Sequence, residues 1–273
     1  SFGVWAIALA NGRADGAPQW VKSDLTPSPV KLTPDGTLYY TIYESMFEVY
    51  AAPIEPETGR SLGAPTAVKS QRTGVRSNPD WSPDGKRLIY KSFSGSETKY
   101  EADALLSVYD LASGEETQIG PGIRSPLALI GPRWRPDGRS VLLVGARSRE
   151  ENGIFQVDLP GGTAKLLVKV PAGQYIFQTV WSPDGKSVFY TQGNPVKILR
   201  RDLASGQDLE LGTMDGPIGL PRIALSPDGK WLAFTSLDKM MEPVKLMLVP
   251  ADGGAAREIY RTGAKVAIQW ISW

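Results

Sequence analysis

The words Trp81-Ser-Pro-Asp-Gly-Lys86 and Trp181-Ser-Pro-Asp-Gly-Lys186 have the same letters but lie in different halves of the chain. Their Pro-Asp-Gly core occurs five times, at intervals of 44 to 53 residues, with its aspartate at Asp35, Asp84, Asp137, Asp184 and Asp228. Proline presets φ for the first position of a turn, and glycine accepts the left-handed conformation that closes a hairpin. Each copy therefore predicts a tight turn between two strands, once in every structural repeat.

Three runs of strand-forming residues follow each turn. The second strands are predicted at 38–43, 87–93, 140–147, 187–192 and 231–236; the third at 47–53, 104–111, 153–159, 197–203 and 245–251; the fourth at 66–70, 117–120, 165–170, 209–213 and 257–262. With the strand before the turn, each repeat has four antiparallel strands. No stretch has helical periodicity, so the chain is predicted to be all-β.

Repeats of this length and strand count are typical of β-propeller blades. The predicted blades are residues 26–70, 71–120, 121–170, 171–213 and 214–262, and residues 263–273 together with 1–25 are predicted to form a closing blade. This arrangement predicts a single domain, a six-bladed propeller around a central channel, whose last blade is shared by both termini and leaves no open edge. Because both ends fall within a repeat, we expect the chain to be a fragment of a longer protein.

The composition excludes several classes of function. Thirty basic side chains against twenty-nine acidic ones give a net charge of +1, which favours neither nucleic acid nor an anionic membrane as a partner. The absence of cysteine and histidine excludes thiolate nucleophiles, Ser-His-Asp triads and histidine-ligated metals. The longest apolar runs are shorter than the ~20 residues of a membrane span, and no signal peptide precedes them, so we expect no direct membrane insertion.

The Trp-Ser-Pro-Asp-Gly-Lys words and their spacing resemble the PD40 (WD40-like) repeats of TolB-type β-propellers, over almost the whole chain. This resemblance implies a bacterial repeat protein, and it favours a periplasmic or exported location. The family includes translocation accessories, gating domains of prolyl-oligopeptidase-type peptidases and sensor domains of bacterial regulators, so the fold does not select one function. The chain departs from the motif at Leu32-Thr33, Arg135 and Leu225, and each departure retains the turn.

Side chains that suggest chemistry also have ordinary structural explanations. A tryptophan immediately before a repeated turn, as at Trp81, Trp134 and Trp181, is predicted to be a wedge between blades rather than a sugar-stacking surface. The five turn aspartates are spread around a ring and cannot converge as calcium ligands, so no metal site is expected. The pairs Glu115-Glu116 and Glu150-Glu151 lie in predicted surface turns, not in a glycosidase site. Without a nucleophile elbow or nucleotide-binding motif, we expect no catalytic residues, no cofactor and no enzymatic activity.

The channel mouth carries the strongest functional signal. In a propeller, the segments that lead into the inner strands share one face, where binding residues usually lie. These segments and the inner strands supply the candidate ligand-binding residues Arg76, Asp80, Arg124, Arg133, Gln178, Arg222 and Gln269. Arginine is suited to bidentate capture of carboxylate or phosphate. We therefore expect a mildly basic funnel that binds a protein, a peptide or a small anionic ligand.

The longest insertion, residues 92–103, joins a second strand to a third strand and is expected to project from the same face as a polar loop. Its Phe93 and Tyr100 are candidate anchors for a partner.

Two classes of function remain open. The first is a non-catalytic binding module, a sensor or scaffold within a larger bacterial protein. The second is an enzyme-associated propeller: the gating domain of a serine peptidase, or a carboxylate-based glycan hydrolase or lyase. The glycan enzyme requires at least two carboxylates buried together in the channel with raised pKa values, and the gating domain requires a neighbouring hydrolase domain.

Overall fold

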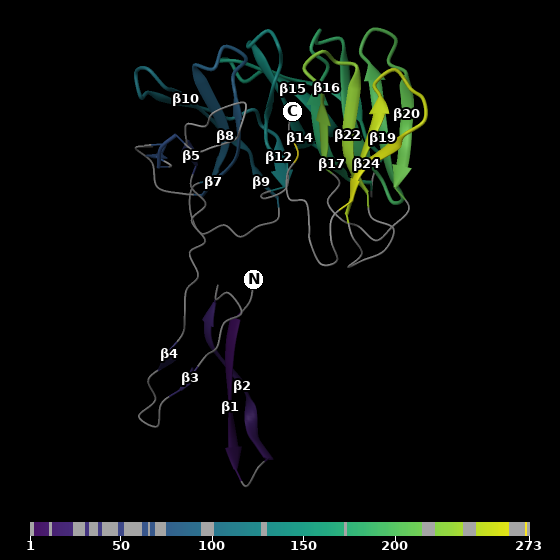
Figure 1. Cartoon of the computed structure of the whole chain (residues 1–273). Coiled ribbons are helices and arrows are strands. Elements are labelled where there is room, and N and C mark those ends of the chain that lie inside the picture. The colour runs from purple at the N-terminus through teal and green to yellow at the C-terminus, as the bar shows by residue number, and fades with distance from the viewer. Residues whose placement is uncertain are drawn as a thin grey trace. The chain divides into compact units, whose positions relative to one another are not determined.

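The computed structural model describes residues 3–10, 13–23, 31–32, 38–39, 49–51, 62–64, 66–68, 75–93, 101–126, 130–171, 174–214, 222–236, 244–261 and 271. Every regular element in these ranges is a β-strand, which confirms the all-β prediction (Figure 1). Within the same ranges, no helix is long and apolar enough to span a membrane. The chain divides into two units, Ser1–Met46 and Phe47–Trp273, and each is described by itself.

The first unit contains two antiparallel pairs of strands. Strand β1 (Gly3–Ala10) pairs with β2 (Arg13–Ser23), and β3 (Lys31–Leu32) pairs with β4 (Leu38–Tyr39) across the first Pro-Asp-Gly word. The residues of that word lie outside the described part of the chain. The closing blade shared by both termini stays a prediction, because most of residues 263–273 are also outside it.

The second unit is a β-propeller, and the structure describes four of its blades in sequence order (Figure 1). Blade 1 consists of β7 (Val75–Trp81), β8 (Arg87–Phe93), β10 (Leu105–Asp110) and β11 (Glu116–Ile119). Blade 2 consists of β12 (Arg124–Pro126), β13 (Arg133–Trp134), β14 (Ser140–Ala146), β15 (Asn152–Asp158) and β16 (Ala164–Lys169), and its inner strand is the broken pair β12 and β13.

Blades 3 and 4 have unbroken inner strands. Blade 3 consists of β17 (Ile176–Trp181), β18 (Ser187–Gln192), β19 (Val196–Asp202) and β20 (Asp208–Met214). Blade 4 consists of β21 (Ile223–Leu225), β22 (Trp231–Ser236), β23 (Lys245–Pro250) and β24 (Arg257–Arg261). Before blade 1, β5 (Tyr50–Ala51) pairs with β6 (Thr66–Ala67), within the predicted third and fourth strands of repeat 26–70.

The insertion at residues 92–103 differs from the prediction. Its last three residues form β9 (Glu101–Asp103), which pairs antiparallel with the inner strand β12 of blade 2 instead of projecting as a loop. The physical reason is the broken inner strand of that blade: β12 meets β14 at a single residue pair, so its other edge offers backbone groups that β9 satisfies. Tyr100 and the side chain of Phe93 lie outside the described residues.

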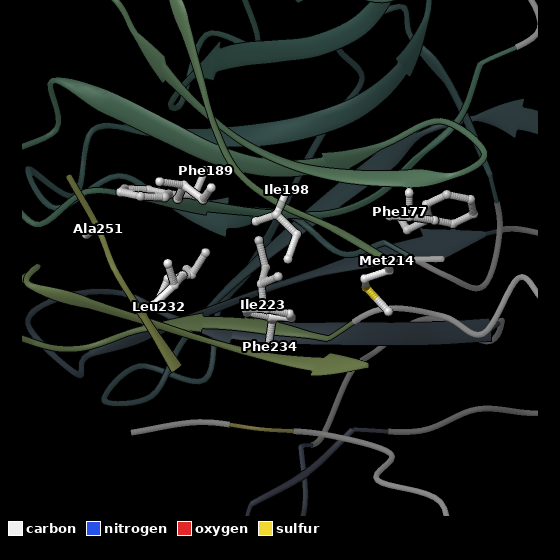
Figure 2. Packing of buried hydrophobic residues seen from close by; sticks show 11 residues of the cluster. Phe177, Phe189, Ile198, Met214, Ile223, Leu232, Phe234 and Ala251 are labelled. Carbon is white, nitrogen blue, oxygen red and sulfur yellow. The ribbon is translucent and has the colours of Figure 1, made fainter. Parts of the chain in front are cut away.

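The core consists of apolar layers between successive blades. Strand β14 is buried on both faces: Val141 and Leu143 pack in the layer shared with blade 1, and Leu142 and Val144 pack in the layer shared with blade 3. The layer between blades 3 and 4 is drawn in Figure 2, where Ile198 and its neighbours meet side chains of the next sheet. Full burial of one such side chain contributes roughly 1.5–3 kcal/mol, so each blade depends on its neighbours for stability.

The Ser-Pro-Asp-Gly turns have the same internal bonds in blades 1, 3 and 4. In blade 3, the hydroxyl of Ser182 donates to Asp184 Oδ1 at 2.6 Å, and the Lys186 N–H donates to the same oxygen at 3.0 Å. The Ser182 hydroxyl donation, followed by the Lys186 N–H, lowers the pKa of Asp184 below its ordinary value. Gly185 has a φ of 66°, which confirms the left-handed conformation expected at this position.

The tryptophans before the turns lie between blades where both neighbours are described. The indole N–H of Trp134 donates to the backbone oxygen of Asp80 in blade 1 at 3.3 Å, and Trp134 and Trp181 are both buried. These contacts confirm the wedge prediction for the two residues. Trp81 differs, since it is 49% exposed, and most of the repeat that precedes it lies outside the described residues.

Candidate functional site

The candidate site lies along the inner strands of the four described blades. Successive inner strands lie beside one another: β7 beside β13, β13 beside β17, and β17 beside β21. Side chains from different blades therefore meet near the axis of the propeller. The contacts along these strands therefore show which of the predicted channel residues are neighbours.

Asp80 and Arg133 form the centre of the site. The carboxylate Oδ2 of Asp80 accepts the backbone N–H of Trp134 at 2.8 Å, and its Oδ1 lies 3.8 Å from Nη1 of Arg133. Burial raises the pKa of Asp80 above its ordinary value, while Arg133 and the backbone N–H groups of Trp134 and Trp81 act in the opposite direction. The carboxylate thus links blade 1 to blade 2 and is the countercharge of Arg133.

Arg222 adds a second guanidinium from blade 4. Its backbone N–H donates to the Thr235 hydroxyl at 2.9 Å, and its C=O accepts the Thr235 N–H at 3.0 Å, which fixes the main chain just before β21. Burial lowers the pKa of the Arg222 guanidinium, and the positive charge of Arg133 lowers it further. Arg133 and Arg222 therefore repel each other although they belong to blades that are not adjacent in sequence.

The remaining predicted residues are less closely connected to this pair. Gln178, on the inner strand β17, is buried, and its backbone N–H donates to the Thr191 hydroxyl at 3.1 Å. Arg76 donates from Nη1 to the backbone oxygen of Val68 in the preceding repeat at 3.0 Å. Arg124 is exposed and stands opposite Asp103 of β9 in the strand register. Gln269 lies outside the described residues.

Two guanidinium groups, Arg133 and Arg222, and the carboxylate of Asp80 form the charged part of the candidate site. An anion placed between the arginines would offset their repulsion, and a carboxylate or phosphate matches the planar donor geometry of guanidinium. The arrangement is therefore chemically suited to binding an anionic group.

The described contacts give less support to bond cleavage. A glycan-cleaving site needs a second carboxylate close to Asp80, and none of the contacts within the described ranges brings one there. Glu151, one of the acidic pair residues, forms a surface ion pair with Arg147 at 3.1 Å. Within the described ranges, no three side chains of the metal-binding types gather in one place.

Lys91 is a buried charged residue that the sequence reasoning missed. It lies on β8, is fully buried, and donates from Nζ to the Ser125 hydroxyl at 3.2 Å, while Ser125 donates to the backbone oxygen of Val144 at 2.7 Å. Burial lowers the pKa of Lys91 to about 7. A lysine in a strand normally predicts a side chain that faces solvent. The one indication that Lys91 is buried was its position among apolar residues in a blade that is covered on both faces.

Comparisons with known proteins agree with the fold. Residues 63–262 match the family model described as PD40, TolB beta propeller domain. The crystal structure of TolB from Acinetobacter baumannii superimposes with a TM-score of 0.53 and 18% sequence identity, over 72% of this chain and 49% of that one. At this identity the similarity shows the fold alone.

Two curated proteins are also similar. The uncharacterized peptidase YuxL of Bacillus subtilis (strain 168) is 25% identical over 197 residues, which cover 58% of this chain and 29% of that protein. The uncharacterized protein Atu1656 of Agrobacterium fabrum (strain C58 / ATCC 33970) is 27% identical over 188 residues, which cover 66% of this chain and 57% of that protein. The chain therefore spans less than two thirds of the length of either relative.

Proposed function

The chain belongs to the PD40 family of TolB β-propellers, and from that premise we propose that its propeller is a non-catalytic recognition module that holds an anionic group at the channel mouth. The ligand is a carboxylate or another oxyanion, presented by a protein, a peptide or a small molecule. The main support is that two guanidinium groups from different blades, Arg133 and Arg222, are close enough for the charge of Arg133 to lower the pKa of Arg222. An anion held between them would offset this repulsion.

The partial burial of Arg222 favours ligand binding at this site. Burial has already removed part of the water around Arg222. Binding of a ligand therefore requires less further desolvation of this guanidinium than it would for a fully exposed arginine. The carboxylate of Asp80 occupies one side of Arg133. A ligand carboxylate that meets both arginines would gain charge-assisted hydrogen bonds, which are roughly twice as strong as neutral ones.

The test is calorimetric titration of the chain with a panel of ligands: an acidic peptide, the same peptide with an amidated C-terminus and glutamine for glutamate, inorganic phosphate, and citrate. We expect an acidic ligand to bind, and the double variant Arg133→Gln, Arg222→Gln to lose at least about tenfold in affinity. Arg139→Gln is the matched control, because Arg139 is exposed and lies beside a Pro-Asp-Gly turn. An affinity that the double variant leaves unchanged would contradict the proposal.

The ring is proposed to have six blades, made of the five complete repeats and a blade shared by the two ends of the chain. The four described blades and the β5–β6 pair account for five of the repeats. A crystal structure of the chain that shows a different number of blades around the channel would overturn this part of the proposal.

A second candidate function is the gating propeller of a serine peptidase. It is favoured by the match to YuxL, which is named a peptidase and of which this chain covers 29%. A gating propeller requires an α/β-hydrolase domain encoded in the same reading frame, whereas a recognition module does not. Sequencing the complete frame decides between them, and an assay of the chain with peptides and with acidic oligosaccharides tests for hydrolase or lyase activity of its own.

A further inference from the structure

Two arginines fasten neighbouring blades in the same way. Arg87 of blade 1 lies over the Trp134 ring of blade 2, 4.8 Å from its centre, and its Nη2 donates to the backbone oxygen of Gly138 at 3.1 Å. Arg135 of blade 2 lies over the Trp181 ring of blade 3 at 5.2 Å, and its Nη2 donates to Gly185 O at 3.4 Å. In both cases a guanidinium fills the space between a tryptophan and the glycine of a Pro-Asp-Gly turn.

The third junction, between blades 3 and 4, is bridged differently in the described part of the chain: Arg200 crosses it to Ala251 O, and not to the glycine of the Pro-Asp-Gly turn. Ser182 stands at the position of Arg135 in the repeated word, Ser187 stands at the position of Arg87, and Leu225 stands where the next blade would have its tryptophan. Within the described ranges, no arginine donates a hydrogen bond to Gly229 O, the equivalent of Gly138 O and Gly185 O.

A cavity of about 490 Å³ opens at this junction. We name it the junction pocket; its lining residues include Ser182, Asp184, Arg200, Gly229, Trp231 and Asp252. Ser182 is at the position of Arg135 in the repeated word, and Gly229 is at the position of Gly185, the glycine to which Arg135 donates. The pocket therefore lies at the place where the first two junctions hold a guanidinium.

The charges around the junction pocket favour a cation. Three carboxylates line it, and of its two cationic groups, Lys230 lies 3.7 Å from Asp228. Arg200 crosses the junction: its Nε donates to the Ser187 hydroxyl of blade 3 and its Nη1 to Ala251 O of blade 4, both at 3.3 Å. In the described part of the chain, the carboxylate of Asp252 and Oδ2 of Asp184 accept no hydrogen bond.

We propose that the junction pocket binds an arginine side chain of a partner protein. The guanidinium takes the position that Arg87 and Arg135 occupy at the other junctions, with Gly229 O and the carboxylates as acceptors. Trp231 also lines the pocket, and the guanidinium of Arg257 lies 5.6 Å from the centre of its ring. The planar group matches this set better than an ammonium ion, because it donates in several directions within one plane. This site is separate from the channel mouth and does not depend on the anion-binding proposal.

The first experiment titrates the chain with acetyl-Gly-Arg-Gly-amide and with the matched lysine and glutamine peptides, followed by calorimetry or by NMR shifts. We expect the arginine peptide to bind at least about tenfold more tightly than the glutamine peptide. Free guanidinium ion and arginine methyl ester distinguish a site for the side chain alone from one that also uses the peptide backbone. Asp252→Asn is expected to weaken the arginine peptide several-fold, and Asp158→Asn, an exposed aspartate of blade 2, is the control.

The second experiment fills the pocket from within. Ser182→Arg places in blade 3 the residue that blade 2 has at the same position, so the repeat accepts the change. We expect the affinity of this variant for the arginine peptide to fall at least tenfold, and its unfolding temperature to rise. The control Thr163→Arg, at an exposed turn of blade 2, is expected to keep the affinity within twofold of the parent's. The proposal is overturned if the arginine peptide binds no better than the glutamine peptide, or if Ser182→Arg binds it as well as the parent chain does.

Discussion

The backbone N–H of Trp134 donates to Oδ2 of Asp80, so a carboxylate on the inner strand of blade 1 is fixed by the inner strand of blade 2. The other oxygen of the same carboxylate faces Arg133. Asp80 therefore has two roles that different substitutions separate: it accepts a structural hydrogen bond, and it partly neutralises the positive charge at the channel mouth.

Asp80→Asn is expected to retain the structural role and remove the charge. The amide oxygen can still accept the Trp134 N–H, so the free energy of unfolding should change by less than about 1 kcal/mol. Binding of an acidic ligand at the channel mouth should become about three- to tenfold tighter, because Arg133 loses its countercharge. Urea denaturation and calorimetry measure the two effects.

Asp80→Ala provides the comparison, since it removes both roles. It leaves a buried N–H group without its acceptor and is expected to lower the free energy of unfolding by about 1–3 kcal/mol. If Asp80→Asn weakened the binding of acidic ligands, the electrostatic account of the channel mouth would be wrong.

Arg135→Ser is expected to release one inter-blade clamp without disturbing its turn, because serine is the residue that blades 1, 3 and 4 have at this position. The loss of the Gly185 hydrogen bond and of the contact with Trp181 should lower the free energy of unfolding by about 1–2 kcal/mol. Arg139→Ser, at an exposed position of the same repeat, should change it by less than about 0.5 kcal/mol. Equal effects of the two substitutions would show that the clamp contributes nothing.

Lys91→Met is expected to remove a pH dependence of stability. Burial lowers the pKa of Lys91 from its ordinary 10.5 to about 7, so between these values the unfolded chain binds a proton that the folded chain does not, and stability rises with pH. Below about pH 7, Lys91 is protonated in both the folded and the unfolded chain, and the full destabilisation from burying its charge is present. The methionine variant should therefore be more stable at pH 7, by on the order of 3 kcal/mol, and should lose this slope.

Denaturation in urea from pH 6 to pH 10 measures the slope. Lys169→Met is the matched control, because Lys169 is exposed on β16 and its substitution should leave the parent's slope in place. A parent chain whose stability is flat across this window would contradict the assignment of the slope to Lys91.

Ser182→Ala is expected to reduce the acid sensitivity of the propeller. The pKa of Asp184 is lowered from its ordinary 3.8, first by the Ser182 hydroxyl, so its contribution to stability is fully present above that value and is lost as the pH falls through the lowered pKa. The parent should lose stability more steeply than Ser182→Ala below about pH 4. In a double-mutant cycle with Asp184→Asn, followed by urea midpoints from pH 2.5 to 6, the two effects should be non-additive.

The turns and the strands beside them could be predicted closely from the sequence. Strands 87–93, 187–192 and 231–236 are confirmed to the residue, and 140–147 ends one residue earlier, at Ala146. The reason is local: Pro-Asp-Gly permits one turn geometry, and that turn fixes where the following strand begins. The outer strands, which depend on the length of longer connections, shift by about a residue at their ends.

Contacts between repeats could not be predicted in the same way. The clamps start from different positions of the repeated word, Arg87 near its end and Arg135 near its beginning, so comparing equivalent positions does not reveal them. At the candidate site, Asp80 and Arg133 were predicted as separate inner-strand residues near the channel, and their contact with each other was not predicted. Nor did the sequence show that Arg76 would donate to Val68, because that contact depends on the packing of the preceding repeat.

Strand β9 has a consequence for how this gene can change. It is encoded within the repeat of blade 1, yet its hydrogen bonds complete the sheet of blade 2. Deleting or duplicating blade 1 by itself would remove β9 from its partner or supply a surplus copy with nothing to pair with. Recombination that moves blade 1 without blade 2 would therefore break this pairing, whereas within the described residues no strand of a neighbouring repeat pairs into the sheet of blade 3.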